Sequence, residues 1–324
     1  MGKIETNNKN RIYTEESLKI LQRLPLELKI KKTENRIREW YRYYGGEVYV
    51  AFSGGKDSTV LLDIARKIYP DIEAVYTDTG LEYPELREFV KTIDNVTWIR
   101  PKENFKKVVQ KYGYPIISKE VANKVHYAKP GNTRWQQLHG EYINPRTGEL
   151  STHYNYKKYE YLLDADFLIS DMCCTVMKKK PSMEYEKRTG KHPILGLMAE
   201  ESHKRKNDYM KTGCNAFNKK RPQSQPMGFW TEQDVLEYLY IRKIPYASVY
   251  GDIVFEDGKY HTTGVRRSGC IWCGFGCHLE KEPNRFQMLK ETHPKLWDYC
   301  MKPLEEGGLG IKHVMNYIGV KVDK

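Results

Sequence analysis

The chain has 324 residues, which allows one large domain or two small ones with a substantial core. Its 54 Lys and Arg against 42 Asp and Glu give a formal net charge of +12, which suits polyanionic ligands without distinguishing a nucleotide from a nucleic acid. No apolar run approaches the roughly 20 residues of a membrane span, and residues 1–11 are polar, without a signal-peptide core. These features argue against a membrane or secreted protein and predict a cytoplasmic one.

The first predicted elements lead into a glycine-rich turn. Apolar side chains recur at helical spacing over residues 25–44. Residues 48–52 are predicted as a buried strand, and residues 59–68 as a helix whose apolar side chains pack on a sheet. The turn between them should therefore lie at the carboxyl end of a strand, where open α/β sheets bind ligands.

This turn, residues 53–58, reads Ser-Gly-Gly-Lys-Asp-Ser and matches neither G-x-x-x-x-G-K-[ST] nor G-x-G-x-x-G. Its glycines let the backbone approach a ligand, so that N–H groups and the next helix N-terminus can face an anion. Lys56 adds a positive charge. Asp57 is expected to hold Mg²⁺ if ATP is the substrate, or alternatively to cap the helix. The predicted phosphate ligands that act through N–H and hydroxyl groups are Ser53, Gly54, Gly55 and Ser58.

Two further strands are predicted over residues 72–77 and 96–100, with a helix that begins at Pro84 between them. This β-α-β-α-β run predicts a parallel sheet with right-handed crossovers, and hence an α/β, Rossmann-like fold. Asp78 and Thr79 end the second strand and are expected to face the adenosine of a nucleotide. A simple turn role for both residues is the alternative.

The rest of the chain divides into an insertion, a resumed core and a tail. Residues 119–160 are rich in Tyr, His, Asn, Lys and Gly, and are expected to form an insertion or long loop over the sheet. Another core strand is predicted over 194–198, and Thr231 to Asp234 form a capping-box signature for a helix. The expected divisions are an N-terminal helical segment at 1–45, a nucleotide-binding α/β domain at 46–250 and a C-terminal helical region with a cysteine pair at 251–324.

The chain has seven cysteines, which in a reducing compartment are expected as metal ligands or reactive thiols rather than disulfides. Cys173 and Cys174 are adjacent, and Cys270, Cys273 and Cys277 follow far downstream. Four thiolates from two short segments can enclose one cluster or metal ion. An iron–sulfur cluster, zinc and unliganded thiols all remain open. Adjacent cysteines favour a cluster, because zinc sites usually draw each pair from a C-x₂₋₄-C turn.

Several motifs together resemble the phosphoadenosine-phosphosulfate reductase family, which shares the pyrophosphatase loop S-G-G-x-D-S with enzymes that bind or make adenylylated compounds. The order is the loop at 53–58, Asp78-Thr79-Gly80, Cys173-Cys174 before three lysines, the segment Gly196 to Ser202, and Cys270-x-x-Cys273. The resemblance covers residues 46–278. It implies an adenine-nucleotide fold and a 4Fe–4S cluster beside the nucleotide phosphates, held by Cys173, Cys174, Cys270 and Cys273, with Cys277 as a bystander. Candidates for phosphate or sulfate contacts are Lys178, Lys179, Lys180, Arg205, Arg266 and Arg267.

One departure puts the reductase chemistry in doubt. Sulfonucleotide reductases carry a nucleophilic cysteine in a C-terminal Glu-Cys-Gly-type motif, and the segment 319–324 has none. Either Cys214 or Cys300 could serve as the reactive thiol. Polar neighbours suggest that Cys214 is exposed, whereas apolar neighbours favour a buried, inert Cys300.

Two enzymatic hypotheses follow from this resemblance. In the first, the chain reduces an adenylyl sulfate to sulfite with a thioredoxin-like reductant. In the second, ATP adenylylates an acceptor and a sulfur donor such as a cysteine desulfurase displaces AMP, as in DNA phosphorothioation or tRNA thiolation. The basic balance and the aromatic insertion favour the second, with DNA or RNA as the acceptor. A nucleotide-sensing protein without turnover is a third class, and a homo-oligomer is left open.

Overall fold

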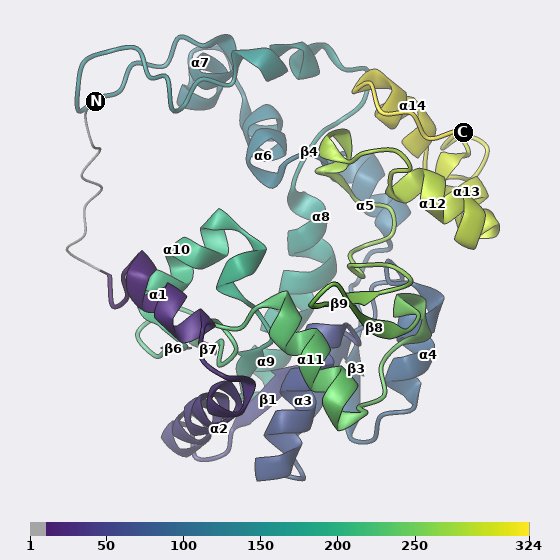
Figure 1. Ribbon diagram of the computed structural model, residues 1–324. Helices are drawn as coiled ribbons and strands as arrows, with labels where there is room; N and C mark the ends of the chain where they lie inside the picture. Colours follow the sequence, from purple (N-terminus) through teal and green to yellow (C-terminus); the bar gives the residue numbers. More distant parts are fainter. Residues whose placement is uncertain (1–10, 324) are drawn as a thin grey trace. The chain divides into compact units, whose positions relative to one another are not determined.

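The computed structural model describes residues 11–323, which form two compact units that interleave along the chain. Unit 1 comprises the described residues up to Asp78, then Tyr83–Ile99 and Ser182–Ser268. Unit 2 comprises Thr79–Glu82, Arg100–Pro181 and the described residues from Gly269 onward. Figure 1 labels most of the helices and strands of both units.

Unit 1 is built on a six-stranded sheet with the order β3-β2-β1-β5-β7-β6. Neighbouring strands from β3 to β7 run parallel, with Val50 opposite Ala74 and Val48 opposite His192, and only β6 pairs antiparallel, with β7. The predicted parallel α/β sheet is therefore confirmed. The strands are β1 (Val48–Ala51), β2 (Ala74–Thr77), β3 (Val96–Ile99), β5 (His192–Leu195), β6 (Asn215–Ala216) and β7 (Gln223–Ser224).

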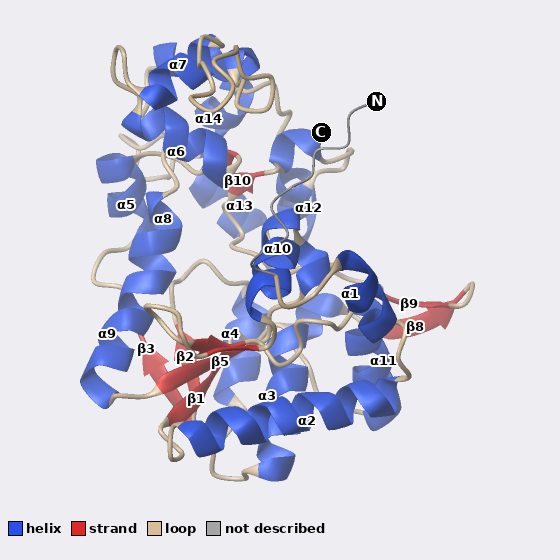
Figure 2. Cartoon of the chain, turned by 90° about the vertical axis from the view of Figure 1, so that its left-hand side faces the viewer, coloured by secondary structure: helices blue, strands red, loops and turns tan. Residues whose placement is uncertain are grey.

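Helices cover the sheet of unit 1 and bury apolar side chains. Helix α3 (Lys56–Ile68) buries Val60, Leu61 and Ile64, and α2 (Leu26–Tyr43) buries Ile37 and Trp40 completely or almost so. Both α2 and α11 (Glu232–Arg242) pack against α3 (Figure 2). The other elements of unit 1 are α1 (Glu15–Gln22), α4 (Pro84–Lys91), α9 (Lys180–Thr189, which begins in unit 2), α10 (His203–Thr212), and the hairpin of β8 (Ile253–Glu256) and β9 (Lys259–Thr262).

Unit 2 is mainly helical, with one short parallel strand pair. Strands β4 (Ile116–Ile117) and β10 (Gly274–Phe275) pair with Ile116 opposite Gly274, which joins two distant parts of the chain. Gly274 is required there, because an added Cβ would lie 2.9 Å from the backbone oxygen of Pro115. The helices are α5 (Phe105–Tyr112), α6 (Lys119–Tyr127), α7 (Thr133–His139), α8 (Met172–Cys174), α12 (Arg285–Thr292), α13 (Pro294–Met301) and α14 (Ile311–Tyr317).

The units differ from the contiguous divisions expected at 1–45, 46–250 and 251–324. The described part of 1–45 is not a separate segment, because α2 belongs to unit 1 and buries Trp40 there. The expected boundary at residue 250 falls inside Ser182–Ser268, which is a continuous part of unit 1. The strand expected over 194–198 is β5, which ends at Leu195. No helix among residues 11–323 is both long and apolar enough to span a membrane.

The segment 119–160 is more ordered than the long loop that its composition suggested. Its helices α6 and α7 begin at side-chain caps, where Ser118 accepts from the Val121 N–H and Asn132 from the Trp135 N–H. Its aromatic rings largely contact their own neighbours. Trp135 stacks on His139 at 3.6 Å, and Arg134 lies over the Tyr127 ring at 4.9 Å.

Candidate functional site

The turn of residues 53–58 joins β1 to α3 in unit 1, as predicted. Gly54 has φ +73°, and an added Cβ would lie 2.8 Å from Val90 Cγ2, so another residue would strain the turn. The Ser58 hydroxyl accepts from the Ser53 N–H at 3.1 Å and donates to the Gly55 carbonyl at 2.9 Å. The predicted phosphate ligands therefore fix one compact turn at a helix N-terminus, which is an arrangement that binds anions.

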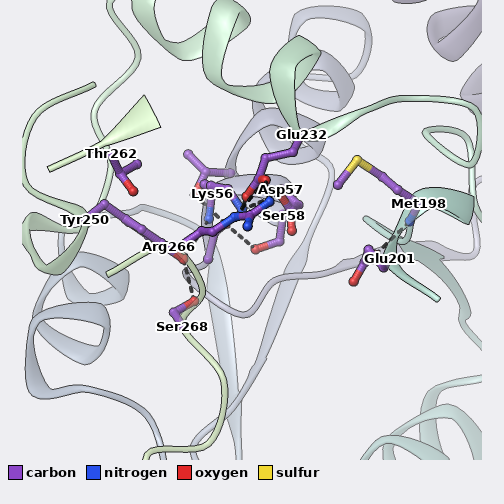
Figure 3. A network of polar contacts seen from close by, with 12 residues as sticks. Lys56, Asp57, Ser58, Met198, Glu201, Glu232, Tyr250, Thr262, Arg266 and Ser268 are labelled. Atoms are coloured by element: carbon purple, nitrogen blue, oxygen red, sulfur yellow. Dashed lines mark hydrogen bonds and ion pairs between the residues drawn. The ribbon is translucent and has the colours of Figure 1, made fainter. Parts of the chain in front are cut away.

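Two residues from the later part of unit 1 close against this turn (Figure 3). The Tyr250 hydroxyl accepts from the Lys56 N–H at 3.3 Å and is hydrogen-bonded to the Ser268 hydroxyl. A Cβ on Gly55 would lie 3.2 Å from Ser268 Oγ and 3.4 Å from Tyr250 OH. Burial raises the pKa of Tyr250 to about 12, so its phenol stays protonated at neutral pH.

The Lys56 side chain lies between two carboxylates. Lys56 is only 6% exposed, and its Nζ is 3.4 Å from Asp57 Oδ1 and 3.5 Å from Glu232 Oε1. Arg266 in turn donates from Nη2 and Nε to Glu232 Oε2, at 2.6 and 3.1 Å. Figure 3 shows Lys56, Asp57, Glu232 and Arg266 gathered at the turn.

Asp57 does not cap α3, and that alternative is wrong. The N-cap is Gly55, which leaves the helix without a side-chain cap, and Asp57 lies in the first turn instead. Its Oδ1 is buried and has no hydrogen-bond partner among the described residues. A buried carboxylate oxygen without a donor suits a hard cation, so Asp57 fits the predicted Mg²⁺ ligand.

Arg205 is also part of unit 1 and lies at the start of α10. Its guanidinium is ion-paired with Glu201. Burial lowers the pKa of Arg205, while the charge of Asp57 acts in the opposite direction. This interaction puts Arg205 within electrostatic range of the turn, as its predicted role in phosphate binding requires.

Asp78 and Thr79 lie at the end of β2 with most of their polar groups engaged. Asp78 accepts from Arg87 Nη2 at 3.1 Å and from Nε at 3.3 Å. The Thr79 hydroxyl donates to the Glu82 carboxylate at 2.8 Å and accepts from the Leu81 N–H at 3.1 Å. The contacts of Thr79 are those of the turn alternative, and a contact of either residue with adenosine remains a prediction.

Unit 2 brings the four predicted cysteine ligands together around one small cavity, which Lys178, Met177 and Phe105 also line. Cys173 Sγ and Cys174 Sγ are 4.0 Å apart. Cys277 is buried and does not line this cavity. Within residues 11–323, no three His, Cys, Asp or Glu side chains form a group suited to a single metal ion.

Electrostatics distinguish the thiols of this cysteine cavity. The hydrogen bond from Cys173 lowers the pKa of Cys174, against the effect of burial, and Lys119 and Lys178 act in the same direction. Burial raises the pKa of Cys273 to about 11. Burial works against the charge of Lys178, but Cys270 and Glu82 together raise its pKa. Four thiols with a lysine at one cavity match the donor set of an iron–sulfur cluster, whose ligands are thiolates.

The exposure expected for Cys214 is wrong. Cys214 is buried, with its thiol 3.9 Å from the Tyr209 hydroxyl, and burial raises its pKa to about 11. Cys300 is buried as expected, with a pKa of about 12. Both thiols are therefore protonated at neutral pH, and neither environment favours a nucleophile.

Sequence reasoning missed Glu232 and Ser268 at the turn. Glu232 stands inside the capping-box signature, which the structure confirms, since Thr231 and Asp234 cap α11 reciprocally. That signature explains Thr231 and Asp234 but carries no information about a contact with Lys56. Arg266 was a candidate for phosphate, and the structure pairs it with Glu232.

The parallel sheet and the glycine-rich turn at the carboxyl end of β1 define an α/β protein with a turn where such sheets bind ligands. The sequence model of the phosphoadenosine phosphosulfate reductase domain matches residues 47–273. This match covers more than half of the chain, which therefore belongs to that family of enzymes.

Individual relatives are distant. An uncharacterised protein of Methanocaldococcus jannaschii is 24% identical over 289 residues, which cover 86% of this chain and 53% of that protein. The adenosine 5'-phosphosulfate reductase of Geobacillus kaustophilus is 28% identical over 236 residues, or 72% of this chain and 75% of the relative. The chain spans about half the length of the two M. jannaschii proteins that it matches.

Among solved structures, the chain is similar to a phosphoadenylyl-sulfate reductase from Candida auris, solved as a phosphate complex. The identity is 14% and the TM-score 0.38, over 73% of this chain and 90% of that one.

Proposed function

We propose that the turn of residues 53–58 binds the phosphates of ATP and that the chain adenylylates an acceptor for sulfur transfer. The observation that carries this proposal is the ion pair of Lys56 with Asp57, whose buried Oδ1 lies 3.4 Å from the Lys56 ammonium and accepts no hydrogen bond. ATP is used as its Mg²⁺ complex, and a carboxylate beside a phosphate turn suits a cation that bridges phosphates. An adenylyl sulfate has no comparable need of a cation.

In the proposed first step, the protein groups that act on ATP belong to this turn. An acceptor oxygen attacks the α-phosphorus of ATP, the bond to the β-phosphate breaks, and pyrophosphate leaves. Lys56 and the N–H groups at the start of α3 would stabilise the negative charge that accumulates on the leaving group. A sulfur donor, for which a cysteine desulfurase is our candidate, then displaces AMP from the acceptor. A nucleic acid is the proposed acceptor.

The second candidate is reduction of an adenylyl sulfate to sulfite, which the name of the G. kaustophilus relative favours. That reaction requires a thiolate that attacks sulfur and a thioredoxin-like reductant. Cys214 and Cys300 are buried with raised pKa values, which speaks against either as the thiolate.

Product analysis separates the two reactions. Anaerobically purified protein is incubated with ATP, Mg²⁺ and DNA or RNA as the acceptor, and separately with adenylyl sulfates and a thiol reductant. We expect pyrophosphate from ATP, and a loss of that activity in Asp57→Asn. Sulfite release without pyrophosphate release would contradict the first proposal and support the second.

We further propose that Cys173, Cys174, Cys270 and Cys273 hold a 4Fe–4S cluster, with zinc as the alternative. Such a cluster would cross-link residues 173–174 to residues 270–273 and place a fixed charge beside Lys178. Iron, sulfide and zinc analysis of single alanine variants tests the assignment. We expect iron to be lost in each of the four and kept in Cys277→Ala and in the buried control Cys300→Ala. Iron kept in Cys174→Ala would contradict it.

A further inference from the structure

The Lys56 ammonium lies in a setting that leaves its N–H donors available. Its side chain is 7% exposed, so the charge is nearly buried. The two carboxylates beside it stand at 3.4 and 3.5 Å from Nζ. Both distances exceed the roughly 2.7–2.9 Å of a charge-assisted hydrogen bond. The charge is compensated, but Nζ keeps its capacity to donate to a ligand.

Glu232 is held in place through both its backbone and its carboxylate. It is the first residue of α11, where the helix N-terminus favours a negative charge. Its backbone N–H donates to Glu200 Oε2 at 2.7 Å, and Arg266 binds its Oε2 through two N–H groups. These contacts leave Oε1 directed at Lys56 Nζ.

Glu232 is also ionised at neutral pH. Burial raises its pKa, but the hydrogen bond from Arg266 and the charges of Lys56, Arg266 and Arg267 outweigh burial, so that its pKa is lowered overall. Thus a fixed negative charge faces the lysine of the phosphate turn in the protein without a ligand.

We propose that Glu232 is a positioning residue, which holds the Lys56 ammonium at the turn and yields it to a bound phosphate. This inference rests on the proposed function, because it requires that the turn binds phosphates. A phosphate at the turn and the Glu232 carboxylate carry like charges and compete for one ammonium. Glu232 therefore keeps Lys56 in place before binding, weakens the hold on the anionic product and so promotes its release.

Pyrophosphate binding measured by calorimetry in EDTA tests the inference without a cation or turnover. In Glu232→Gln the competing charge is gone, and we expect binding about five- to tenfold tighter than in wild type. In Arg266→Gln the Glu232 charge loses its partner, and we expect weaker binding. The matched control is Glu237→Gln, the same change on α11 at a residue whose charged neighbours are Asp234 and Lys29. It should bind as wild type does.

A double variant shows whether Glu232 acts through Lys56. If it does, the increase in pyrophosphate affinity caused by Glu232→Gln should be much smaller in a Lys56→Met background. An unchanged gain in that background would mean that Glu232 simply repels the ligand, which would overturn the positioning role.

The remaining outcomes distinguish a failure of this inference from a failure of the proposed function on which it rests. Wild-type protein that binds no pyrophosphate would contradict the proposed function itself. Binding in wild type that is unchanged or weaker in Glu232→Gln, at an unchanged melting temperature, would overturn the inference alone. A loss of affinity in Mg²⁺ but not in EDTA would identify Glu232 as a cation ligand instead. If Glu232→Gln does not fold, Glu232→Asp takes its place, because the shorter side chain withdraws the carboxylate from Lys56; tighter pyrophosphate binding is again expected, and unchanged or weaker binding would overturn the inference.

Discussion

At the scale of single residues, burial separates thiols that can react from thiols that cannot. Cys214 and Cys300 are both buried, and their pKa values are raised to about 11 and about 12. A thiol attacks as its thiolate, so a raised pKa lowers its reactivity at every pH below that value.

We therefore expect Cys214 and Cys300 to resist alkylation by iodoacetamide in native protein at pH 8, and to react fully in urea. Their native rates should rise with pH toward 11, because the thiolate fraction grows about tenfold per pH unit below the pKa. Peptide mass spectrometry after timed quenching measures each site. Rapid labelling of native Cys214 at pH 8 would contradict its burial and restore it as a candidate nucleophile.

Lys56 shows how far a sequence motif predicts a site. The motif correctly placed a lysine in a turn between a strand and a helix, and such a turn suggests a surface side chain. Lys56 is buried instead, because Glu232, from a helix far along the chain, lies against it. A local pattern carries no information about such a distant partner.

We expect Lys56→Ala to lower pyrophosphate release by about a hundredfold or more, as loss of a charge that stabilises a transition state does. Because Asp57 and Glu232 lose their counterion, the free energy of unfolding should also fall by about 1 kcal/mol. Lys56→Arg keeps the charge and serves as the control for stability. Full turnover in Lys56→Ala, measured at saturating ATP, would remove Lys56 from the site.

At the scale of elements, a buried ion pair ties α2 to α11 in unit 1. Lys29 is 2% exposed and donates to both carboxylate oxygens of Asp234 at 2.6 Å. Asp234 also accepts from the Thr231 N–H and hydroxyl, at 2.6 and 2.7 Å. One carboxylate thus completes the helix cap and neutralises a buried lysine.

Removing the Asp234 carboxylate in Asp234→Ala should cost about 3 kcal/mol or more of unfolding free energy. The Lys29 charge would then stay buried without a counter-charge, with only the Gln22 carbonyl accepting from its Nζ. The same two helices offer a matched control. Arg242 of α11 pairs with Glu27 of α2 at 2.7 Å, with side chains 40% and 66% exposed. Arg242→Ala should cost less than about 1 kcal/mol. Urea unfolding of both variants gives the comparison, and equal costs would refute it.

The elements themselves were largely predictable, because their signals are local. The helix over 25–44, the helix that begins at Pro84 and the cap at Thr231 all appear near their predicted positions. The helices within 119–160 were missed, since its many Tyr, His and Gly residues hid the caps at Ser118 and Asn132. For Cys214 the error was the reverse, because polar sequence neighbours suggested exposure, whereas the thiol is buried and lies 3.9 Å from the Tyr209 hydroxyl.

At the scale of the whole molecule, the net charge of +12 suggests a polyanionic partner but does not locate its surface. Lys129, Arg134 and Arg146 are exposed in the segment 119–160 and are candidates for phosphate contacts. Several aromatic rings of this segment contact one another, as Trp135 does His139 and Tyr142 does Tyr154, although Tyr127 and Tyr154 remain partly exposed.

If the acceptor is a nucleic acid, DNA or RNA should bind with an affinity that falls steeply with salt, with a log–log slope of about 0.7–0.9 per phosphate contact. Filter binding should show weaker affinity and a smaller slope for Lys129→Ala/Arg134→Ala/Arg146→Ala. The control Lys19→Ala/Lys31→Ala/Lys32→Ala removes equal charge from exposed positions of α1 and α2. Equal effects of both variants would indicate that the net positive charge attracts nucleic acid without a specific surface. If neither DNA nor RNA binds at low salt, a nucleic-acid acceptor is excluded.

The interleaving of the two units has a consequence for how the protein is made. Strand β1 lies between β2 and β5, and β5 begins only at His192, after the ribosome has synthesised most of unit 2. Strand β4 likewise cannot pair until β10, which begins at Gly274, has been synthesised. Until then one edge of β1 has backbone groups without a strand partner, and such edges invite pairing with other chains. During translation the nascent chain therefore depends on late segments, or on a chaperone, to shield a strand that emerged early.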